Sequence, residues 1–285
     1  MTRFKQYREL PPEFVKQKLE EFFAEDCINN DITTSSTQTS GHAVRAVFIA
    51  KEPLLFAGKE IINQGFSDCR VEDIVNDGES LNRGDVIASI HGNIDIILKK
   101  ERVVLNLIQR LSGIASTAFK LSQITQKHNI ELLDTRKTTP GFRLFEKFAV
   151  AIGGGTNHRF SLQEAVMIKD NHLIGNSDIL KAVSSAKASN PDEDIQIEVD
   201  TEDQVNVALE SDATSLLLDN FQPETLPGVI QKIRTHPKGA NMYVELSGGI
   251  TADTLEEFCI DGVSGISMGA LTHNIKSKDI SLDIK

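Results

Sequence analysis

The stretch Ile195-Gln-Ile-Glu-Val199 decides the fold, together with the two runs that follow it, Ser215–Leu218 and Tyr243–Leu246. Each run is short and rich in apolar residues, as strands of a parallel sheet covered on both faces are. Helical spacing returns between the runs, for example over Asp203–Leu209, where Thr201 is a candidate N-cap. Successive runs lie roughly 20 to 30 residues apart, which is the size of one βα unit. The sequence therefore predicts an α/β fold with parallel strands.

Three further candidate strands extend this pattern: Ile130–Asp134, Ala165–Ile168 and Gly265–Met268. A second helical segment, Asp253–Cys259, follows Thr251. A complete eight-unit α/β barrel typically takes about 250 residues, and the region from 116 to 272 is much shorter. We therefore expect residues 116–272 to form an incomplete or compressed α/β barrel.

The first 115 residues have a different rhythm. Apolar residues recur at helical spacing over residues 12–24, and the short alternating run Ala43–Ile49 follows. Residues 77–90 are typical of two turns and a strand. An amphipathic helix is predicted over residues 100–112, and Gly113 is expected to end it. We expect a smaller α+β domain over residues 1–115, with the C-terminal tail, about residues 273–285, as a candidate to pack on it.

The composition restricts the possible partners. The chain has 285 residues, of which 40% are hydrophobic and 25% charged, and its formal net charge is −11. This balance argues against nucleic acid and anionic membranes, because both require a basic surface. No apolar stretch approaches the roughly 20 residues that span a bilayer, and residues 1–21 carry no secretory signal pattern. The three cysteines are scattered and form no CxxC pair, so we expect a cytoplasmic protein.

One stretch departs from the acidic background. Residues 136–172 contain six Lys or Arg against three acids, a local balance of +3, together with His158 and His172. A basic island in an acidic chain indicates a focused site for a small anion. Chance clustering on a solvated surface is the alternative that the spacing alone leaves open.

Charged or Gly-rich residues stand at or just past the end of every candidate strand, where the active site of an α/β barrel lies. Arg and Lys supply donors for carboxylates and phosphates, while paired acids bind sugar hydroxyls or hold a metal through water. Gly turns expose backbone N–H groups to a phosphate. These features predict a site for a phosphorylated sugar and a second anion. The residues concerned are Thr135, Arg136, Lys137, His158, Arg159, Lys169, Glu198, Asp219, Ser247, Gly248, Gly249, Met268, Gly269 and Ala270.

Longer motifs carry a resemblance to a known family. The central ones are Thr135-Arg-Lys-Thr-Thr-Pro-Gly-Phe-Arg-Leu-Phe-Glu-Lys-Phe-Ala-Val, Gly153-Gly-Gly-Thr-Asn-His-Arg and Ile168-Lys-Asp-Asn-His. Shorter ones match in order, namely Glu101-Arg-Val-Val-Leu-Asn, Leu111-Ser-Gly-Ile-Ala, Leu217-Leu-Asp-Asn, Leu246-Ser-Gly-Gly-Ile and Met268-Gly-Ala-Leu-Thr-His. From about residue 20 the chain resembles the quinolinate phosphoribosyltransferases, or carboxylating nicotinate-nucleotide pyrophosphorylases. Ala151 and Thr156 depart from the family pattern, where a basic residue and a Val are expected.

The resemblance implies an N-terminal α+β sandwich domain and an open α/β barrel, assembled as a homodimer or higher homo-oligomer. It implies the conversion of quinolinate and phosphoribosyl pyrophosphate to nicotinate mononucleotide, pyrophosphate and carbon dioxide in NAD biosynthesis. Mg²⁺ is the expected cofactor, held through the substrate and water near Glu198 and Asp219 without a direct protein ligand.

The resemblance also implies roles for the site residues. Arg102 would reach into the neighbouring subunit's site. The quinolinate carboxylates would be held by Arg136, His158, Arg159 and Lys169, with Lys137 and Lys169 also near the phosphosugar. Glu198 and Asp219 would bind the ribose hydroxyls, and the 5′-phosphate would meet Ser247–Gly249 and Met268–Ala270. Thr135 completes the substrate-binding set, and the residues expected to act in catalysis are Arg136, Lys137, Glu198 and Asp219.

Three alternatives are weighed against this interpretation. A related molybdenum-transport-associated subfamily shares the fold, although its segments at Asn157-His-Arg and Ile168-Lys-Asp-Asn-His differ. A barrel lyase could form a Schiff base on Lys137 or Lys169. A non-catalytic relative could bind only a nucleotide, but every expected site residue is present in this chain.

Overall fold

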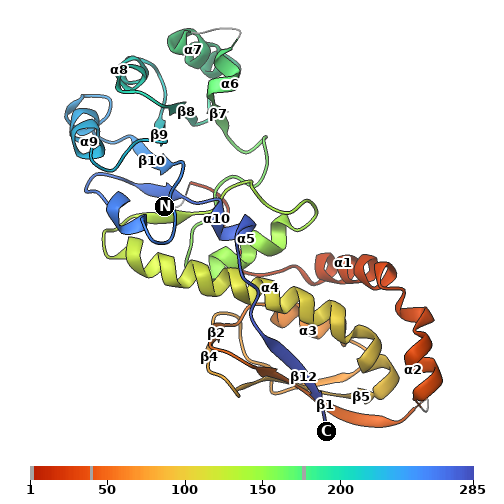
Figure 1. Ribbon diagram of the computed structural model, residues 1–285. Helices are drawn as coiled ribbons and strands as arrows, with labels where there is room; N and C mark the ends of the chain where they lie inside the picture. Colours follow the sequence, from red (N-terminus) through yellow and green to blue (C-terminus); the bar gives the residue numbers. More distant parts are fainter. Residues whose placement is uncertain (1–2, 39–40, 175–177) are drawn as a thin grey trace. The chain divides into compact units, whose positions relative to one another are not determined.

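The computed structural model describes residues 3–38, 41–174 and 178–285. The chain divides into two compact units, each made of separate segments (Figure 1). The parallel-sheet unit contains the described residues of 1–6, 120–138 and 155–273, and the antiparallel-sheet unit contains those of 7–119, 139–154 and 274–285. The sequence-based boundary between residues 115 and 116 falls within one long helix, α4 (Ile94–Gln126).

Six parallel strands form the sheet of the first unit, in the order β6-β11-β10-β9-β8-β7. Chain order is preserved around the sheet from β7 to β11, and β11 then pairs with β6. Within the described ranges β6 and β7 share no ladder, so the barrel is open between them, as the sequence predicts. The strands are β6 (Glu131–Leu133), β7 (Val166–Ile168), β8 (Ile195–Val199), β9 (Ser215–Asp219), β10 (Tyr243–Ser247) and β11 (Gly265–Ser267).

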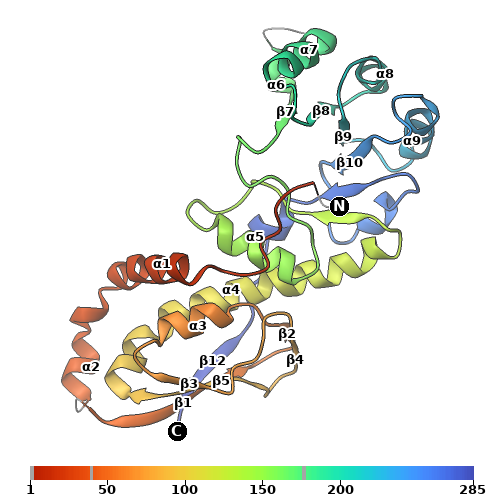
Figure 2. The ribbon, with the colours of Figure 1, turned by 180° about the vertical axis from the view of Figure 1, so that it is seen from behind.

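The two faces of these strands differ in chemistry. In β8, for example, Ile195, Ile197 and Val199 alternate with Gln196 and Glu198. Because side chains alternate along a strand, one face of the sheet is aliphatic and the other carries polar groups. Helices α7 (Ile179–Ser189), α8 (Glu202–Glu210) and α9 (Leu226–Thr235) follow β7 to β9 along the outside of the sheet (Figures 1 and 2). The polar face is therefore left for the interior of the barrel.

Local signals account for some helices and not for others. Thr201 caps α8 as predicted, since its side chain accepts from the Gln204 N–H at 3.3 Å and Gln204 reaches back in a capping box. The predicted helix over Asp253–Cys259 is wrong, because only the 3₁₀ turn η2 (Leu255–Phe258) forms there. Two single-turn helices, α6 (Asp170–Leu173) and α10 (Ala270–His273), follow β7 and β11 directly.

The second unit is built on an antiparallel sheet in the order β12-β1-β5-β3. The last strand of the chain, β12 (Ile280–Ile284), pairs along β1 (Ala43–Ala50) from Ile280 opposite Ala50 to Ile284 opposite Ala46. No helix of the described residues is long and apolar enough to cross a membrane. The other elements are α1 (Pro12–Glu25), η1 (Ile28–Asn30), α2 (Ile32–Thr37), β2 (Leu54–Leu55), α3 (Lys59–Gly65), β3 (Arg70–Glu72), β4 (Ser80–Leu81), β5 (Val86–Asn93) and α5 (Arg143–Ile152).

Gly113 does not end the helix predicted over residues 100–112, because α4 continues to Gln126. The glycine serves a close approach of two backbones instead. A Cβ added at Gly113 would lie 2.4 Å from the carbonyl oxygen of Lys276, in the segment leading to β12. A glycine in a helical pattern thus had two physical explanations, a C-cap or a tight crossing, and the sequence pattern does not separate them.

Gly113→Ala should therefore destabilise the protein by about 1–3 kcal/mol, since the added methyl group overpacks the crossing. The matched control is Gly228→Ala in α9, where a Cβ would meet nothing within 4 Å. There the same substitution should stabilise by about 0.5–1 kcal/mol, through the ordinary helix preference of alanine. Urea unfolding midpoints of the two variants test this, and equal shifts of the same sign would contradict it.

Candidate active site at the carboxyl ends of the parallel strands

An acid and a lysine meet at the ends of β7 and β8. The Lys169 ammonium forms an ion pair with the Glu198 carboxylate, and not with its neighbour Asp170. Burial raises the pKa of Glu198, Lys169 opposes that rise, and the nearby carboxylates of Asp219 and Asp170 add to it. The carboxylates of Glu198 and Asp219 are therefore close enough to interact. As a result, Glu198 at this edge binds a proton more tightly than an ordinary glutamate does.

The next two strands end side by side. Asp219, at the end of β9, is in register with Ser247, at the end of β10. Gly248 and Gly249 follow with φ of +90° and +65°, and a Cβ at Gly248 would lie 2.3 Å from Asn220 Oδ1. Only glycine fits so close to Asn220 with this positive φ. The turn places backbone N–H groups beside the Asp219 carboxylate, whose oxygens are acceptors for hydroxyl groups.

The ends of β6 and β11 meet in the same way. The Met268 N–H donates to the Leu133 carbonyl at 3.0 Å, and the Thr272 hydroxyl donates to the Lys137 carbonyl at 2.7 Å. A Cβ at Gly269 would lie 2.8 Å from Lys137 Cδ, so the lysine stem packs directly on this glycine. The lysine is thereby held next to a second Gly turn, with its side chain exposed.

A buried acid at the end of β6 fixes the segment between α5 and β7. Asp134, fully buried, accepts from the Asn157 side-chain amide at 2.7 Å and from the His158 N–H at 2.8 Å. The His158 ring then uses both of its nitrogens inside the protein. Its Nδ1 accepts the Arg159 N–H at 2.7 Å, and its Nε2 lies 3.2 Å from a Glu245 carboxylate oxygen. This arrangement requires the ring hydrogen on Nε2.

Two guanidinium groups lie close together beside this loop. Arg159 is 5% exposed and donates to the Ala165 carbonyl at 2.9 Å. Burial lowers the pKa of Arg159, and the positive charge of Arg136 lowers it further. The Arg136 Nε is buried, and no hydrogen-bond acceptor lies within reach among the residues that the structure describes. Such a pair gains from an anion between its members, because a buried unpaired donor costs free energy.

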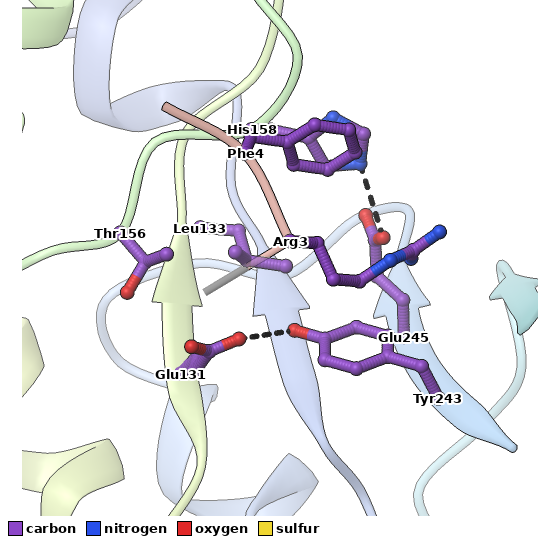
Figure 3. A pocket seen from close by; sticks show the side chains of 8 residues that line it. All are labelled: Arg3, Phe4, Glu131, Leu133, Thr156, His158, Tyr243 and Glu245. Atoms are coloured by element: carbon purple, nitrogen blue, oxygen red, sulfur yellow. Dashed lines mark hydrogen bonds and ion pairs between the residues drawn. The ribbon is translucent and has the colours of Figure 1, made fainter. Parts of the chain in front are cut away.

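A pocket next to His158 is lined largely by polar side chains, and Arg3 and Phe4 from the start of the chain line it too. Figure 3 shows the ring of Phe4 stacked on His158 and the Arg3 side chain beside Tyr243. The Tyr243 hydroxyl donates to Glu131 at 2.6 Å, and burial, followed by that carboxylate, raises the pKa of Tyr243. The pocket is lined by Arg3, Phe4, Glu131, Leu133, Thr156, His158, Tyr243 and Glu245.

The structure places all but one of the predicted site residues in the parallel-sheet unit, on strand ends, on the loops that follow them or, for His158 and Arg159, on the segment between α5 and β7. The exception is Arg102, which is exposed on the part of α4 that belongs to the antiparallel-sheet unit. In the described part of the chain no group of three His, Cys, Asp or Glu side chains could hold a metal ion directly. The carboxylates of Glu198 and Asp219 fit a hydrated divalent cation, which they would hold through its water.

Sequence reasoning gave no role to several residues that the site uses. Glu245 and Gln196 sit inside apolar runs, and a polar residue within a buried strand is a signal that could have identified them. Asp134 is predicted only as the last residue of a candidate strand. No sequence pattern marks Phe4, because its contact with His158 is formed only when the folded chain brings residue 158 next to its first residues.

The chain is similar to known proteins over nearly its whole length. The family models for the N-terminal and C-terminal domains of quinolinate phosphoribosyl transferase match residues 31–112 and 114–283. A Bacillus subtilis protein named probable nicotinate-nucleotide pyrophosphorylase [carboxylating] is 43% identical over 275 residues, covering 95% of this chain and 93% of that protein. An Archaeoglobus fulgidus protein of the same name is 34% identical, covering 89% and 98%. The solved nicotinate-nucleotide pyrophosphorylase of Francisella tularensis has a TM-score of 0.91 at 33% identity, covering 99% and 100%.

The raised pKa of Glu198 predicts a pH-dependent difference between wild type and Glu198→Gln. Ionised Glu198 is less favourable in the folded than in the unfolded chain, whose pKa is near 4.5. The stability of wild type relative to the variant should therefore be greatest in acid and fall as the pH rises through a value above 4.5.

Thermal unfolding of both proteins between about pH 4 and pH 8 measures this difference, and taking it at each pH cancels the titration of other groups. A wild-type advantage that grew with pH would mean that the ion pair with Lys169 outweighs burial.

Proposed function

Because the chain belongs to the quinolinate phosphoribosyltransferase family, we propose that its active site is the carboxyl edge of the open barrel. The enzyme converts quinolinate and phosphoribosyl pyrophosphate to nicotinate mononucleotide, pyrophosphate and carbon dioxide in NAD biosynthesis. In this arrangement quinolinate lies beside the loop after β6, and the phosphosugar lies over the ends of β8 to β11.

The quinolinate side rests on one observation above the others, the closeness of Arg136 and Arg159. Burial lowers the pKa of Arg159, and repulsion from the Arg136 charge lowers it further. The buried Nε of Arg136 is a donor for an incoming carboxylate oxygen. A dicarboxylate relieves both conditions at once, because each carboxylate can accept from a guanidinium fork. Lys169 adds a third cation, and His158 precedes Arg159 on the segment between α5 and β7.

The phosphosugar side uses acids and glycine turns. Glu198 and Asp219 accept from the ribose hydroxyls and from the water shell of Mg²⁺. The turns Ser247–Gly249 and Met268–Ala270 offer backbone N–H groups to the 5′-phosphate. Lys137, packed on Gly269, is held where its ammonium meets a phosphate oxygen. Thr135 accepts the Lys137 N–H at 3.0 Å and so fixes the start of this loop.

The chemistry follows from this placement. Pyrophosphate leaves the ribose C1 with oxocarbenium character; Lys137 stabilises the leaving charge, and the Glu198 and Asp219 carboxylates offset the positive ring. Mg²⁺, when bound with the substrate, neutralises charge on the pyrophosphate. The cations hold the pyridine nitrogen close to C1, which makes its attack effectively unimolecular. When carbon dioxide departs, the electron pair of the broken C–C bond stays on the ring carbon beside the alkylated, positively charged nitrogen, and that carbon then takes a proton from water. No covalent enzyme intermediate is required.

Two alternatives predict other outcomes. A Schiff-base lyase needs a lysine that is free to attack a carbonyl, yet the Lys169 ammonium is ion-paired with Glu198. A molybdenum-transport-associated relative would form no nicotinate mononucleotide. A coupled assay with quinolinate, phosphoribosyl pyrophosphate and Mg²⁺, with nicotinate as the control substrate, separates these functions. We expect nicotinate mononucleotide to form with quinolinate and not with nicotinate. The absence of product with quinolinate would refute the proposal.

Arg136→Ala and Lys137→Ala should each reduce turnover at least about a hundredfold, or about 2.7 kcal/mol of barrier, because each removes a charge from the reacting anions. Lys232→Ala is the matched control, since that lysine forms a surface ion pair with Glu202 on α8. Surface pairs contribute little, so this variant should retain full activity. Near-normal turnover in both site variants would show that the site lies elsewhere.

We also propose that the enzyme works in the cytoplasm as a homodimer or higher oligomer, with Arg102 completing the site of the neighbouring subunit. Arg102 is exposed on α4, as a residue that serves another subunit must be. Arg102→Ala and Lys137→Ala should then each be inactive alone but complement each other when subunits are exchanged. Random exchange would make half of the dimers mixed, and each mixed dimer would carry one intact site of two, so about a quarter of wild-type activity should return.

Native mass spectrometry of a mixture in which one variant is isotope-labelled shows whether subunits exchange, and size-exclusion chromatography gives the oligomeric state. Exchange without recovered activity would contradict a shared site, and a monomer with full activity would do so as well.

A further inference from the structure

His158 is held by the protein on three sides. Asp134 accepts from its backbone N–H, Glu245 lies against its Nε2, and the ring of Phe4 covers its face with the centroids 4.7 Å apart at an interplanar angle of 26°. At 5% exposed, the ring has little surface left for a ligand. Its remaining nitrogen accepts the backbone N–H of Arg159, so the orientation of the imidazole controls the position of that arginine.

Glu245 is the firmest of these supports. Its side chain is 1% exposed, and it also accepts from the Gln196 side-chain amide at 2.7 Å. Burial acts to raise the pKa of Glu245, but His158 and the hydrogen bonds from Gln196 and Ser267 outweigh it, so the pKa is lowered. An ionised acceptor therefore stands under Nε2 and selects the tautomer whose Nδ1 can accept.

The start of the chain supplies the other support. Gln6 binds both backbone groups of Asn157, accepting from its N–H at 2.8 Å and donating to its carbonyl at 3.1 Å. Arg3 donates to the Ser215 hydroxyl at 3.0 Å and lies 4.9 Å from the centroid of the Tyr243 ring. Ser215 and Tyr243 are the first residues of β9 and β10, so residues 3–6 run through the barrel from the amino ends of the strands towards His158.

We propose that residues 3–6 and Glu245 form a support beneath the quinolinate side of the site, in which Phe4 and Glu245 act as positioning residues that fix Arg159 through His158. The inference rests on the proposed function, because it assigns to Arg159 the quinolinate carboxylates. Neither Phe4 nor Glu245 touches the substrate. The support concerns one substrate only, since the ribose and phosphate groups are assigned to strand ends that His158 does not contact.

Selective weakening of quinolinate binding is the signature of this arrangement. Without the ring of Phe4 the imidazole gains a second rotamer, and without the Glu245 charge its tautomer is no longer fixed. Either change moves the Arg159 backbone by a fraction of an ångström, which is enough to weaken a bidentate contact. A general loss of stability would instead lower the amount of active enzyme and leave both KM values unchanged.

The experiment compares Phe4→Leu, Phe4→Tyr and Glu245→Gln with wild type. Leucine keeps apolar bulk but removes the stacking face, whereas tyrosine restores it. The matched control is Phe258→Leu, since Phe258 is a buried phenylalanine of the same unit, in η2, with 8% exposure. KM for quinolinate, KM for phosphoribosyl pyrophosphate and kcat are measured, and calorimetry gives the quinolinate Kd directly.

Phe4→Leu and Glu245→Gln should raise the quinolinate KM and Kd about tenfold or more, with less than about a threefold change in the other KM. Phe4→Tyr and Phe258→Leu should leave the quinolinate KM near the wild-type value. Equal rises in both KM values, or a rise in Phe258→Leu as large as in Phe4→Leu, would overturn the support.

If Glu245→Gln does not fold, the comparison of Phe4→Leu with Phe4→Tyr tests the support without it. A wild-type enzyme without activity on quinolinate would refute the proposed function itself. An active wild type with an unaffected Phe4→Leu variant would refute only the support.

Discussion

The parallel register of the six strands is the constraint on which the rest of the site depends. It aligns Glu198 with Leu217, and Leu217 with Glu245, so polar side chains from neighbouring strands gather on one face of the sheet. Two residues further along, Asp219 and Ser247 stand opposite each other at the carboxyl edge. The aliphatic residues of the same strands pack outward, which stabilises the sheet while leaving its interior chemically active. A shift of one residue in any strand would exchange these faces.

The charged groups in the polar interior differ in whether a protein contact compensates them. Buried Glu245 is paired with His158 and Gln196, whereas Glu198 keeps an elevated pKa in spite of its ion pair with Lys169. Arg136 and Arg159 repel each other and leave a buried donor. His158 and Glu245 are thus paired inside the protein, whereas Arg136, which is assigned to substrate, keeps a buried Nε without an acceptor among the described residues. Such an arrangement sacrifices stability for preorganised binding.

Much of this architecture could be predicted from the sequence, because local patterns encode it. The six strands of the open barrel lie where the apolar runs place them, to within a residue or two at each end. The α8 cap is a local signal too. The failures have the opposite cause: Gly113 serves a crossing with Lys276, and Phe4 stacks on His158, 154 positions along the chain. No window of sequence contains both partners of such a contact. The helix predicted over residues 253–259 is wrong for another reason, because the apolar spacing there accompanies only one 3₁₀ turn.

The central claim is that the carboxyl edge of one open barrel holds a pyridine dicarboxylate and a phosphorylated ribose side by side. A crystal structure with quinolinate and an unreactive phosphoribosyl pyrophosphate analogue tests it most directly. The account predicts carboxylate oxygens within hydrogen-bond distance of Arg136 and Arg159, and a 5′-phosphate on the backbone of Ser247–Gly249. Quinolinate bound away from both arginines, or a phosphate bound away from the two glycine turns, would contradict it.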